Sequence, residues 1–240
     1  MALFNSLTFD SQNSLTYGVY ITGEGVFNAP ERAMERVSIP GRNGDLILDY
    51  GRYENIEVTY PAGVFGADET TFATKIMQFR NVLTSRYTYK RLTDTYHTDE
   101  FRLAVFRGGL EVDPVQKTRA GEFDIVFDCK PQRFLTSGES TTTFTADGTI
   151  SNPTAYPSRP LITVTGNGTL VVNGVSMVIG GSSNTVIDCE LMECYDGANS
   201  KNGDVVMTPN QFPVLDSGSN TIDLSTGITK VEIVPRWWRL

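Results

Sequence analysis

The residues of this sequence that could do chemistry are few. Its 240 residues include one histidine, His97, and three cysteines, Cys129, Cys189 and Cys194. A serine or cysteine nucleophile needs a base beside it, and a typical zinc site needs three or four His or Cys ligands at short spacings. His97 lies in Thr95–Thr98, where a surface or hydrogen-bonded histidine in a loop is the simpler interpretation. We therefore predict no bound metal and no histidine-based catalysis.

Paired carboxylates, which hydrolyse glycosidic bonds, are the other chemistry that the sequence offers. The pairs are Glu111/Asp113, Asp99/Glu100 and Glu190/Glu193. A chain with a net charge of −8 places such pairs on its solvated surface without any catalytic purpose. The sequence has neither a Gly-x-Ser-x-Gly nucleophile elbow nor a Gly-x-x-x-x-Gly-Lys-Ser/Thr phosphate loop. We predict that the protein is not an enzyme and needs no cofactor.

Composition restricts the remaining classes of function. Three scattered cysteines are not a disulfide framework, and we expect them to be small buried hydrophobic residues. No apolar run is long enough to cross a membrane, and the first ten residues do not resemble a signal peptide, so we expect synthesis in the cytoplasm. The acidic net charge disfavours sequence-specific binding of nucleic acid, because phosphate is repelled.

Strand patterns dominate the chain. In Glu122–Asp128 the residues Phe123, Ile125 and Phe127 share one face, as in a half-buried strand. Asn173-Gly174 separates two β-rich runs and predicts a type I′ hairpin turn. Further strands are expected at Ser14–Ile21, Ile56–Tyr60, Tyr87–Arg91, Phe101–Arg107, Leu161–Thr165, Thr169–Val172, Val175–Ile179, Thr185–Ile187, Thr221–Leu224 and Lys230–Val234.

One helix is expected, from about Thr70 to Arg86. Its apolar residues recur at spacings of four, three and four, which places them on one helical face that should pack against a sheet. Asp68 or Thr70 can cap its first turn. The residues of the stripe are Phe72, Ile76, Phe79 and Leu83.

The chain should form two domains, residues 1–134 and 135–240. The stretch Leu135–Tyr156 is rich in Ser, Thr and Gly, and it predicts an exposed linker that merges into an edge strand. The residues after it carry fewer charges and form short runs of strand type, which is typical of a β-sandwich.

Two short segments are candidates for contacts with other proteins. In Ile39-Pro40-Gly41-Arg42, Pro40 restricts φ, Gly41 permits unusual backbone angles, and the arginine offers a donor fork to carboxylates on a neighbour. With Arg36, this turn is predicted to be an assembly contact. The alternative is a tight turn that serves only its own domain.

The second candidate is Trp237-Trp238 near the C-terminus. Neighbouring residues of a strand point to opposite faces, so one tryptophan can lie in the core while the other contacts a partner. Simple packing of both is the alternative.

Four segments, in order along the chain, resemble the distal tail (Dit) proteins of long-tailed, non-contractile phages. The resemblance covers most of the chain. Its segments are Arg36–Tyr60 with the Ile-Pro-Gly-Arg-Asn-Gly turn, Gly121–Phe134, Asn152–Val164, and Asp188 through Ile222-Asp223-Leu224 to the C-terminal tryptophans.

The resemblance implies a mainly β fold. The first domain would be a tail-tube-like β-sandwich or partial barrel with one helix, and the second a galectin-like β-sandwich. Sugar binding does not follow from that fold, since the only histidine lies outside the second domain.

The resemblance also implies a structural hub of the virion tail tip. This hub would be a homohexameric ring that lines the DNA channel and connects the tail tube to the baseplate. Its expected partners are the tail tube protein, the tail-associated lysin protein, the tape measure protein and receptor-binding proteins, while DNA passes without sequence-specific binding. The alternatives are another tail subunit, such as a tube or minor baseplate protein, and a sugar-binding module that contacts the host cell wall.

Overall fold

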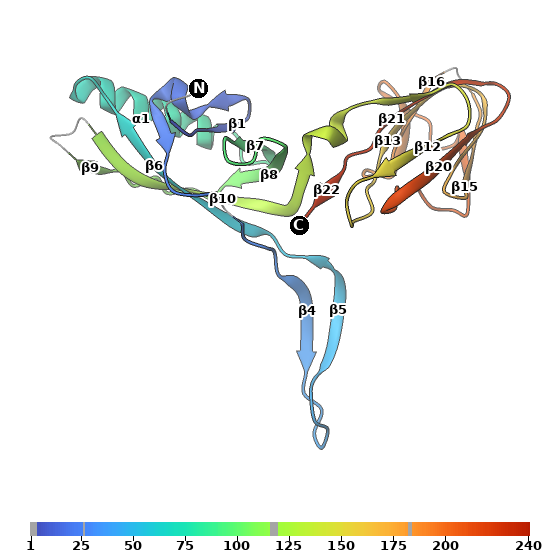
Figure 1. Cartoon of the computed structure of the whole chain (residues 1–240), viewed down its shortest axis with the longest axis horizontal. Helices are drawn as coiled ribbons and strands as arrows, with labels where there is room; N and C mark the ends of the chain where they lie inside the picture. Colours follow the sequence, from blue (N-terminus) through green and yellow to red (C-terminus); the bar gives the residue numbers. More distant parts are fainter. Residues whose placement is uncertain (1–3, 26, 116–119, 182–183) are drawn as a thin grey trace. The chain divides into compact units, whose positions relative to one another are not determined.

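The structure is a computed structural model that describes residues 4–25, 27–115, 120–181 and 184–240, without the side chains of 113–115. The chain divides into two compact units (Figure 1). The first runs from residue 1 to Arg133 and includes Leu240, and the second runs from Phe134 to Arg239. The division therefore falls at the start of the stretch that the sequence predicted to be a linker.

The first unit is built on a curled antiparallel sheet with the order β2-β1-β7-β8-β10-β6-β3, and β9 also pairs with β10. Its longest ladder joins β10 to β6 in continuous register, from Ala120 opposite Phe65 to Cys129 opposite Ile56. The strands are β1 (Leu7–Phe9), β2 (Gln12–Asn13), β3 (Val19–Ile21), β6 (Ile56–Phe65), β7 (Lys90–Asp94), β8 (Glu100–Phe106), β9 (Asp113–Val115) and β10 (Ala120–Leu135).

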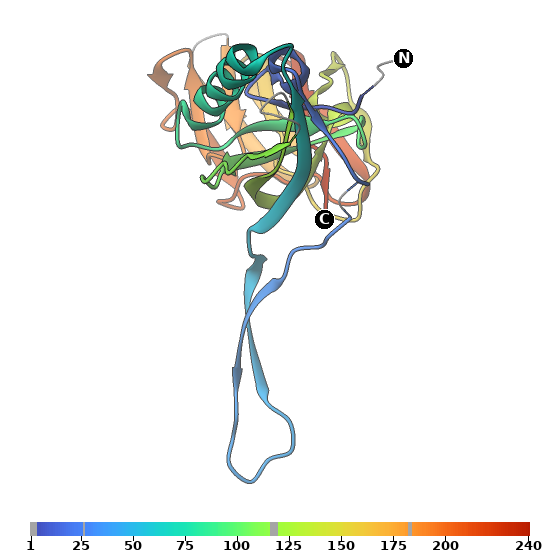
Figure 2. The same cartoon turned by 90° about the vertical axis from the view of Figure 1, so that its left-hand side faces the viewer.

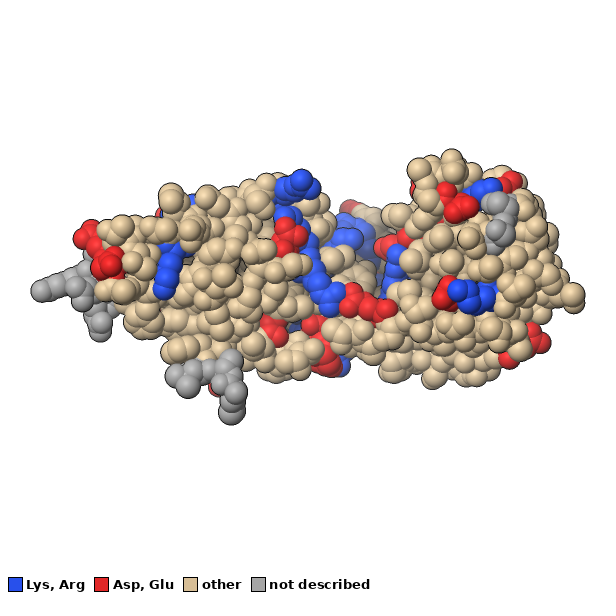
Figure 3. All heavy atoms as spheres, turned by 90° about the horizontal axis from the view of Figure 1, so that it is seen from above, with Lys and Arg blue, Asp and Glu red and all other residues tan. Residues whose placement is uncertain are grey.

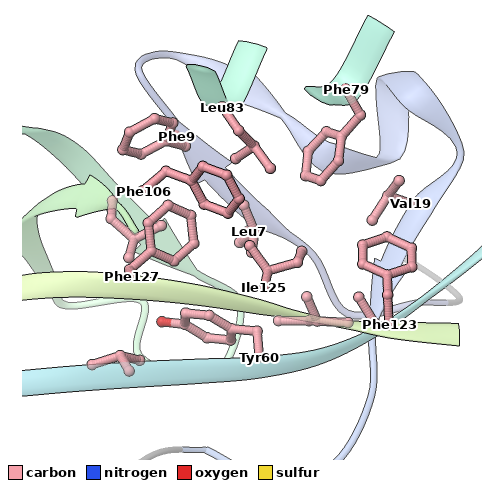
Figure 4. Close-up of a cluster of buried hydrophobic side chains, with 14 of the residues drawn as sticks. Leu7, Phe9, Val19, Tyr60, Phe79, Leu83, Phe106, Phe123, Ile125 and Phe127 are labelled. Carbon is pink, nitrogen blue, oxygen red and sulfur yellow. The ribbon is translucent and has the colours of Figure 1, made fainter. Parts of the chain in front are cut away.

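Helix α1 (Glu69–Thr84) covers one face of this sheet. The Asp68 side chain caps it by accepting a 2.8 Å hydrogen bond from the Thr71 amide. All four residues of the predicted apolar stripe are buried. Figure 4 shows Phe79 and Leu83 of this stripe above the side chains of Phe123, Ile125 and Phe127, which share one face of β10 as predicted.

A two-stranded sheet, which we call the arm, projects from the first unit (Figures 1 and 2). Strand β4 (Arg32–Val37) pairs antiparallel with β5 (Leu46–Tyr53), from Val37 opposite Leu46 to Arg32 opposite Tyr53. The register shifts between Arg32 and Met34. Neither strand pairs with the curled sheet, so the backbone of the arm is held mainly by its own ladder.

The second unit contains two sheets that enclose one apolar core. The six-stranded sheet has the order β11-β21-β13-β16-β17-β18, and the five-stranded sheet has the order β12-β20-β14-β15-β19. Their strands are β11 (Thr142–Phe144), β12 (Gly148–Asn152), β13 (Leu161–Gly166), β14 (Gly168–Val172), β15 (Val175–Ile179), β16 (Asn184–Asp188), β17 (Glu193–Asp196), β18 (Asn199–Ser200), β19 (Val205–Thr208), β20 (Gly218–Leu224) and β21 (Ile228–Val234). The short strand β22 (Trp238–Arg239) pairs with β10.

The predicted hairpin turn is confirmed. Asn173 and Gly174 have φ angles of 47° and 80°, which a type I′ turn requires at both central positions. Strands β14 and β15 flank the turn, with Val172 opposite Val175.

The strand expected at Tyr87–Arg91 begins only at Lys90, as β7, and two other local predictions were wrong. The stretch after Leu135 is not an exposed linker: a 3₁₀-helix (Thr136–Glu139) leads into β11 and β12, and Phe144 and Ile150 of these strands are buried in the second core. Within Ser14–Ile21, only Val19–Ile21 forms a strand, because Ser14–Tyr17 forms a 3₁₀-helix that the Asn13 side chain caps at Leu15.

Candidate assembly surface

The predicted rigid turn lies at the tip of the arm. The Arg42 amide donates a 3.2 Å hydrogen bond to the Ile39 carbonyl, which closes a four-residue turn. Gly41 has a φ of 81°, and a proline precedes it. This is the arrangement of a type II turn, with Pro at the second position and Gly at the third. The loop that joins β4 to β5 is thus held by its own backbone chemistry.

Three side-chain contacts order the arm. The Arg32 guanidinium donates to both oxygens of Asp49, at 2.9 and 2.7 Å. These hydrogen bonds, and one from the Gly51 amide, lower the pKa of Asp49. The Tyr50 hydroxyl donates a 2.7 Å hydrogen bond to Glu35, and this contact raises the pKa of the tyrosine. The Arg32–Asp49 and Tyr50–Glu35 hydrogen bonds link β4 to β5 and so stabilise the register of the arm.

The arm exposes apolar side chains on both faces. On one face, Val37 lies opposite Leu46 and Glu35 opposite Leu48. On the other, Arg36 lies opposite Ile47 and Met34 opposite Asp49. Ile47 is 59% exposed, and Leu46, Leu48 and Met34 are each more than two-fifths exposed. Exposed apolar side chains on a projection of this kind make the arm a candidate interaction surface.

Arg36 and Arg42 are cations without a carboxylate partner among the residues that the structure describes. The arm's other two arginines, Arg32 and Arg52, form ion pairs with Asp49 and Glu54. The structure therefore brings the predicted contact residues Arg36, Ile39, Pro40, Gly41 and Arg42 together on one projection: the first in β4 and the other four in the tip turn.

The base of the arm is attached to the first unit by polar contacts. The buried Arg133 donates a 3.0 Å hydrogen bond to the Asn28 carbonyl and forms an ion pair with the buried Glu100. The Asn28 side chain in turn donates to the Glu57 carbonyl at 2.9 Å. These bonds fix the segment that enters β4, so the arm leaves the unit at a defined point.

The two C-terminal tryptophans have different environments. Trp237 is 5% exposed and packs in the second core, which leaves little of it for a partner. Trp238 stacks on Tyr156 with ring centroids 4.7 Å apart, and its indole nitrogen donates to the Pro157 carbonyl at 3.0 Å. Trp238 is half-buried, so it remains the candidate of the pair for a contact with a partner.

His97 is held in a structural cluster. Its Nδ1 lies 3.1 Å from an oxygen of Asp94, which also accepts the backbone amides of Tyr96 and His97 at 2.8 Å. The other Asp94 oxygen accepts a 2.8 Å hydrogen bond from the Tyr60 hydroxyl. Burial, followed by the charge of Asp94, raises the pKa of Tyr60 well above its usual value. The cluster ties β7 to β6 and has the hydrogen-bonded character expected of a structural histidine.

The carboxylate pairs do not form a shared site in the described residues. Glu100 is buried against Arg133, while Glu190 is exposed on the turn after β16 and Glu193 is exposed at the start of β17. The side chain of Asp113 lies outside the described residues. Within the described part of the chain, no group of three or more His, Cys, Asp or Glu residues is arranged to hold a metal ion.

Charges of both signs are interspersed on the surface that Figure 3 shows. The coloured residues of that view form small groups rather than one field of a single sign. A strongly basic stripe, which is the electrostatic mark of nucleic-acid binding, is not seen on this face. Among the described helices, none has the length and hydropathy needed to cross a membrane.

Comparison with known proteins identifies the class of the first unit. Residues 12–129 match the family model described as phage tail protein RIFT-related domain, so the first unit is similar to that family of phage tail proteins. No curated protein sequence matches the chain.

Solved structures extend the likeness to the whole chain. The crystal structure of the SPP1 Dit protein, described as a paradigm of the hub adsorption apparatus of phages that infect Gram-positive bacteria, is 16% identical with a TM-score of 0.74. The match covers 98% of this chain and 99% of that one. A chain of the phage p2 baseplate in its activated conformation with Sr is 9% identical, with a TM-score of 0.51 and coverage of 95% and 97%. The chain therefore has the Dit fold, a mainly β architecture with one α-helix among the described residues.

Proposed function

We propose that this protein is a structural hub of a phage tail tip, and that six copies form a ring between the tail tube and the baseplate. The observation that carries the proposal is the arm. A two-stranded ribbon is marginally stable alone in water, and this one exposes apolar side chains on both faces. Burial against another subunit would stabilise it. The Dit fold, and the match of residues 12–129 to a phage tail domain family, support a role in a phage tail.

A ring requires a heterologous interface, in which one patch on a copy meets a different patch on the next. A projection with a rigid tip suits this geometry, because it reaches away from the unit that carries it. In the proposed hub, the ring encloses the DNA channel, and DNA passes without sequence-specific contacts. The acidic net charge of each copy suits that passage, since phosphate is repelled.

The second unit is proposed to be the galectin-like domain of the hub. In this role it faces other proteins of the tip, with the tail-associated lysin protein and receptor-binding proteins as expected neighbours. The tail tube and tape measure proteins would meet the other side of the ring. We assign the chain no catalytic role and no cofactor.

Electron microscopy and native mass spectrometry of the purified protein test the proposal. The expected result is a ring with a central hole and a mass of six chains. If the protein stays monomeric at high concentration, alone and with its tail tube protein, the hub proposal is wrong. Binding of cell-wall glycans by a strictly monomeric protein would favour the sugar-binding module instead.

A further inference from the structure

Three aromatic side chains form a stack on the free face of the curled sheet, at its β3 edge. The Tyr20 ring stacks on that of Phe65, with centroids 5.4 Å apart and an angle of 11° between their planes, and it lies 5.2 Å from the Phe4 ring at a tilt of 39°. Phe4 is 48% exposed and Phe65 is 51% exposed. Tyr20 points away from the core, because its neighbours Val19 and Ile21 are the buried residues of β3. We call these three residues the aromatic stack.

The backbone beneath the stack is adapted to it. Tyr20 pairs with Gly63 in the register of β3 and β6, and its ring lies directly over this glycine. A Cβ on Gly63 would come within 2.3 Å of the Tyr20 hydroxyl. The absence of a side chain at this position therefore makes room for the hydroxyl end of the Tyr20 ring over the strand.

Two carboxylates lie beside the stack. Glu122 of β10 is opposite Gly63, so Glu122, Gly63 and Tyr20 form one row across three strands. Asp124 follows on the same face of β10, opposite Pro61. Burial and then the charge of Glu122 raise the pKa of Tyr20. Both carboxylates are exposed, and neither has a cationic partner among the described residues.

The arm carries the complementary set of groups. Arg36 lies opposite Ile47, so a cation and an exposed aliphatic side chain share one face. Met34, 42% exposed, lies on the same face, and Arg42 stands at the tip. Guanidinium groups bind carboxylates through paired hydrogen bonds and also stack on aromatic rings. The arm thus has two unpaired cations with apolar neighbours, and the stack has two unpaired anions with aromatic neighbours.

We propose that the Arg36–Ile47 face of one copy's arm docks on the aromatic stack of the next copy. Ile47 and Met34 cover Phe4, Tyr20 and Phe65, while Arg36 and Arg42 pair with Glu122 and Asp124. This inference rests on the proposed ring and names the surface that receives the arm. The occupant is a second copy, since the arm's residues are exposed in their own chain and the charges of the two surfaces match.

Charge reversal tests the pairing. Arg36→Glu alone and Glu122→Arg alone should each weaken ring formation at least about 10-fold, as measured by the concentration at which hexamers appear. The variant that combines both changes should recover to within about 3-fold of the original protein, because the pair is restored with its signs exchanged. Arg86→Glu and Glu111→Arg are the controls: both alter exposed residues of the first unit outside the two surfaces. If the double variant assembles no better than the single variants, the pairing is wrong.

Cross-linking provides a second test that does not depend on the stability of reversed variants. Arg36→Lys keeps the positive charge and lets a carbodiimide couple the new amine to a carboxylate. In rings mixed from ¹⁴N- and ¹⁵N-labelled chains, the expected cross-link joins residue 36 of one copy to Glu122 or Asp124 of another. Rings that form but give cross-links only elsewhere would overturn this inference and leave the proposed hub standing. If the original protein forms no rings, the proposed function itself fails.

The aromatic part of the surface can be tested in the same assay. Phe65→Ser should weaken ring formation at least about 10-fold, since aromatic anchors dominate interface energies. Tyr87→Ser is the matched control, because Tyr87 is 84% exposed and lies outside the stack. Equal behaviour of the two variants would show that the stack is not a contact.

Discussion

The Arg236 guanidinium donates two hydrogen bonds to the Asp188 carboxylate, of 2.7 and 2.9 Å. Asp188 ends β16, and Arg236 lies between β21 and β22 with a left-handed φ of 57°. The side chain of Asp188 is 5% exposed. Its carboxylate also accepts the amides of Glu190 and Leu191, so the pair connects the C-terminal segment to the turn after β16.

This contact predicts a pH-dependent loss of stability. Burial opposes ionisation of Asp188, but the hydrogen bonds and charge of Arg236 and the two amides outweigh it, so the pKa is lowered. A carboxylate with a lowered folded-state pKa stabilises the protein above its unfolded pKa of about 3.9, and loses that effect as pH falls through the folded value. Asp188→Asn should cost about 2 kcal/mol of the free energy of unfolding at pH 7, the order expected for hydrogen bonds to a charged group.

Denaturant unfolding across pH measures this effect. The difference between the original protein and Asp188→Asn should be largest near neutral pH and shrink below about pH 4. Asp223→Asn, at an exposed position of β20, is the control. A difference that stays constant from pH 7 to pH 3 would contradict the role given to the Asp188 charge.

The tip of the arm gives a prediction about assembly without loss of folding. Arg36→Ala combined with Arg42→Ala removes two exposed cations that make no ion pair in the described part of the chain. We expect the melting temperature of the protomer to change by less than about 2 °C, because such surface changes stay within about 0.5 kcal/mol. Light scattering should show weaker assembly, and complementation should show fewer complete tails. Normal rings, or an unfolded protomer, would each contradict the prediction.

Proteolysis gives a test that needs no variant. In the free protomer, trypsin should cut first at Arg42, because exposed loop tips are the preferred sites of cleavage. In assembled rings the same bond should be protected if the arm is buried against a neighbour. Mass spectrometry of the first fragments, taken below and above the assembly concentration, measures both. Equal cleavage rates in the two states would indicate that the arm stays exposed in the ring.

Much of the fold could be predicted from local patterns. The stripe from Phe72 to Leu83 predicted the helix, and Asn173-Gly174 predicted the hairpin, because spacing and backbone preference determine these features within a few residues. Strand β4 was missed. Arg32–Val37 alternates charged and apolar residues weakly, and its ladder depends on β5 across a loop of eight residues.

The candidate site was predicted only in part. The chemistry of Pro40 and Gly41 identified the turn, since its geometry is local. The aromatic stack gave no signal, because Tyr20 and Phe65 meet only when β3 pairs with β6, and Phe4 joins them through the bridge between Asn5 and Ile21. Long-range register is a property of the folded sheet, and short windows of sequence do not contain it.

The same limit explains why Leu135–Tyr156 looked like a linker: Phe144 and Ile150 are isolated apolar residues until the second core surrounds them.

The three thiols give the last prediction. Burial raises the pKa of Cys129 and Cys189 to about 12 and that of Cys194 to about 11. Since the thiolate is the reactive form, a thiol of pKa 12 is ionised in only about one molecule in 10,000 at pH 8, against about a quarter for an ordinary cysteine. All three side chains are also closed to reagents, because each is buried in a core. An aromatic disulfide reagent at pH 8 should therefore titrate no thiol in the folded protein and three per chain in denaturant. A thiol that reacts within seconds in the folded protein would contradict the burial of that cysteine, and its position, found by peptide mapping, would show which core opens.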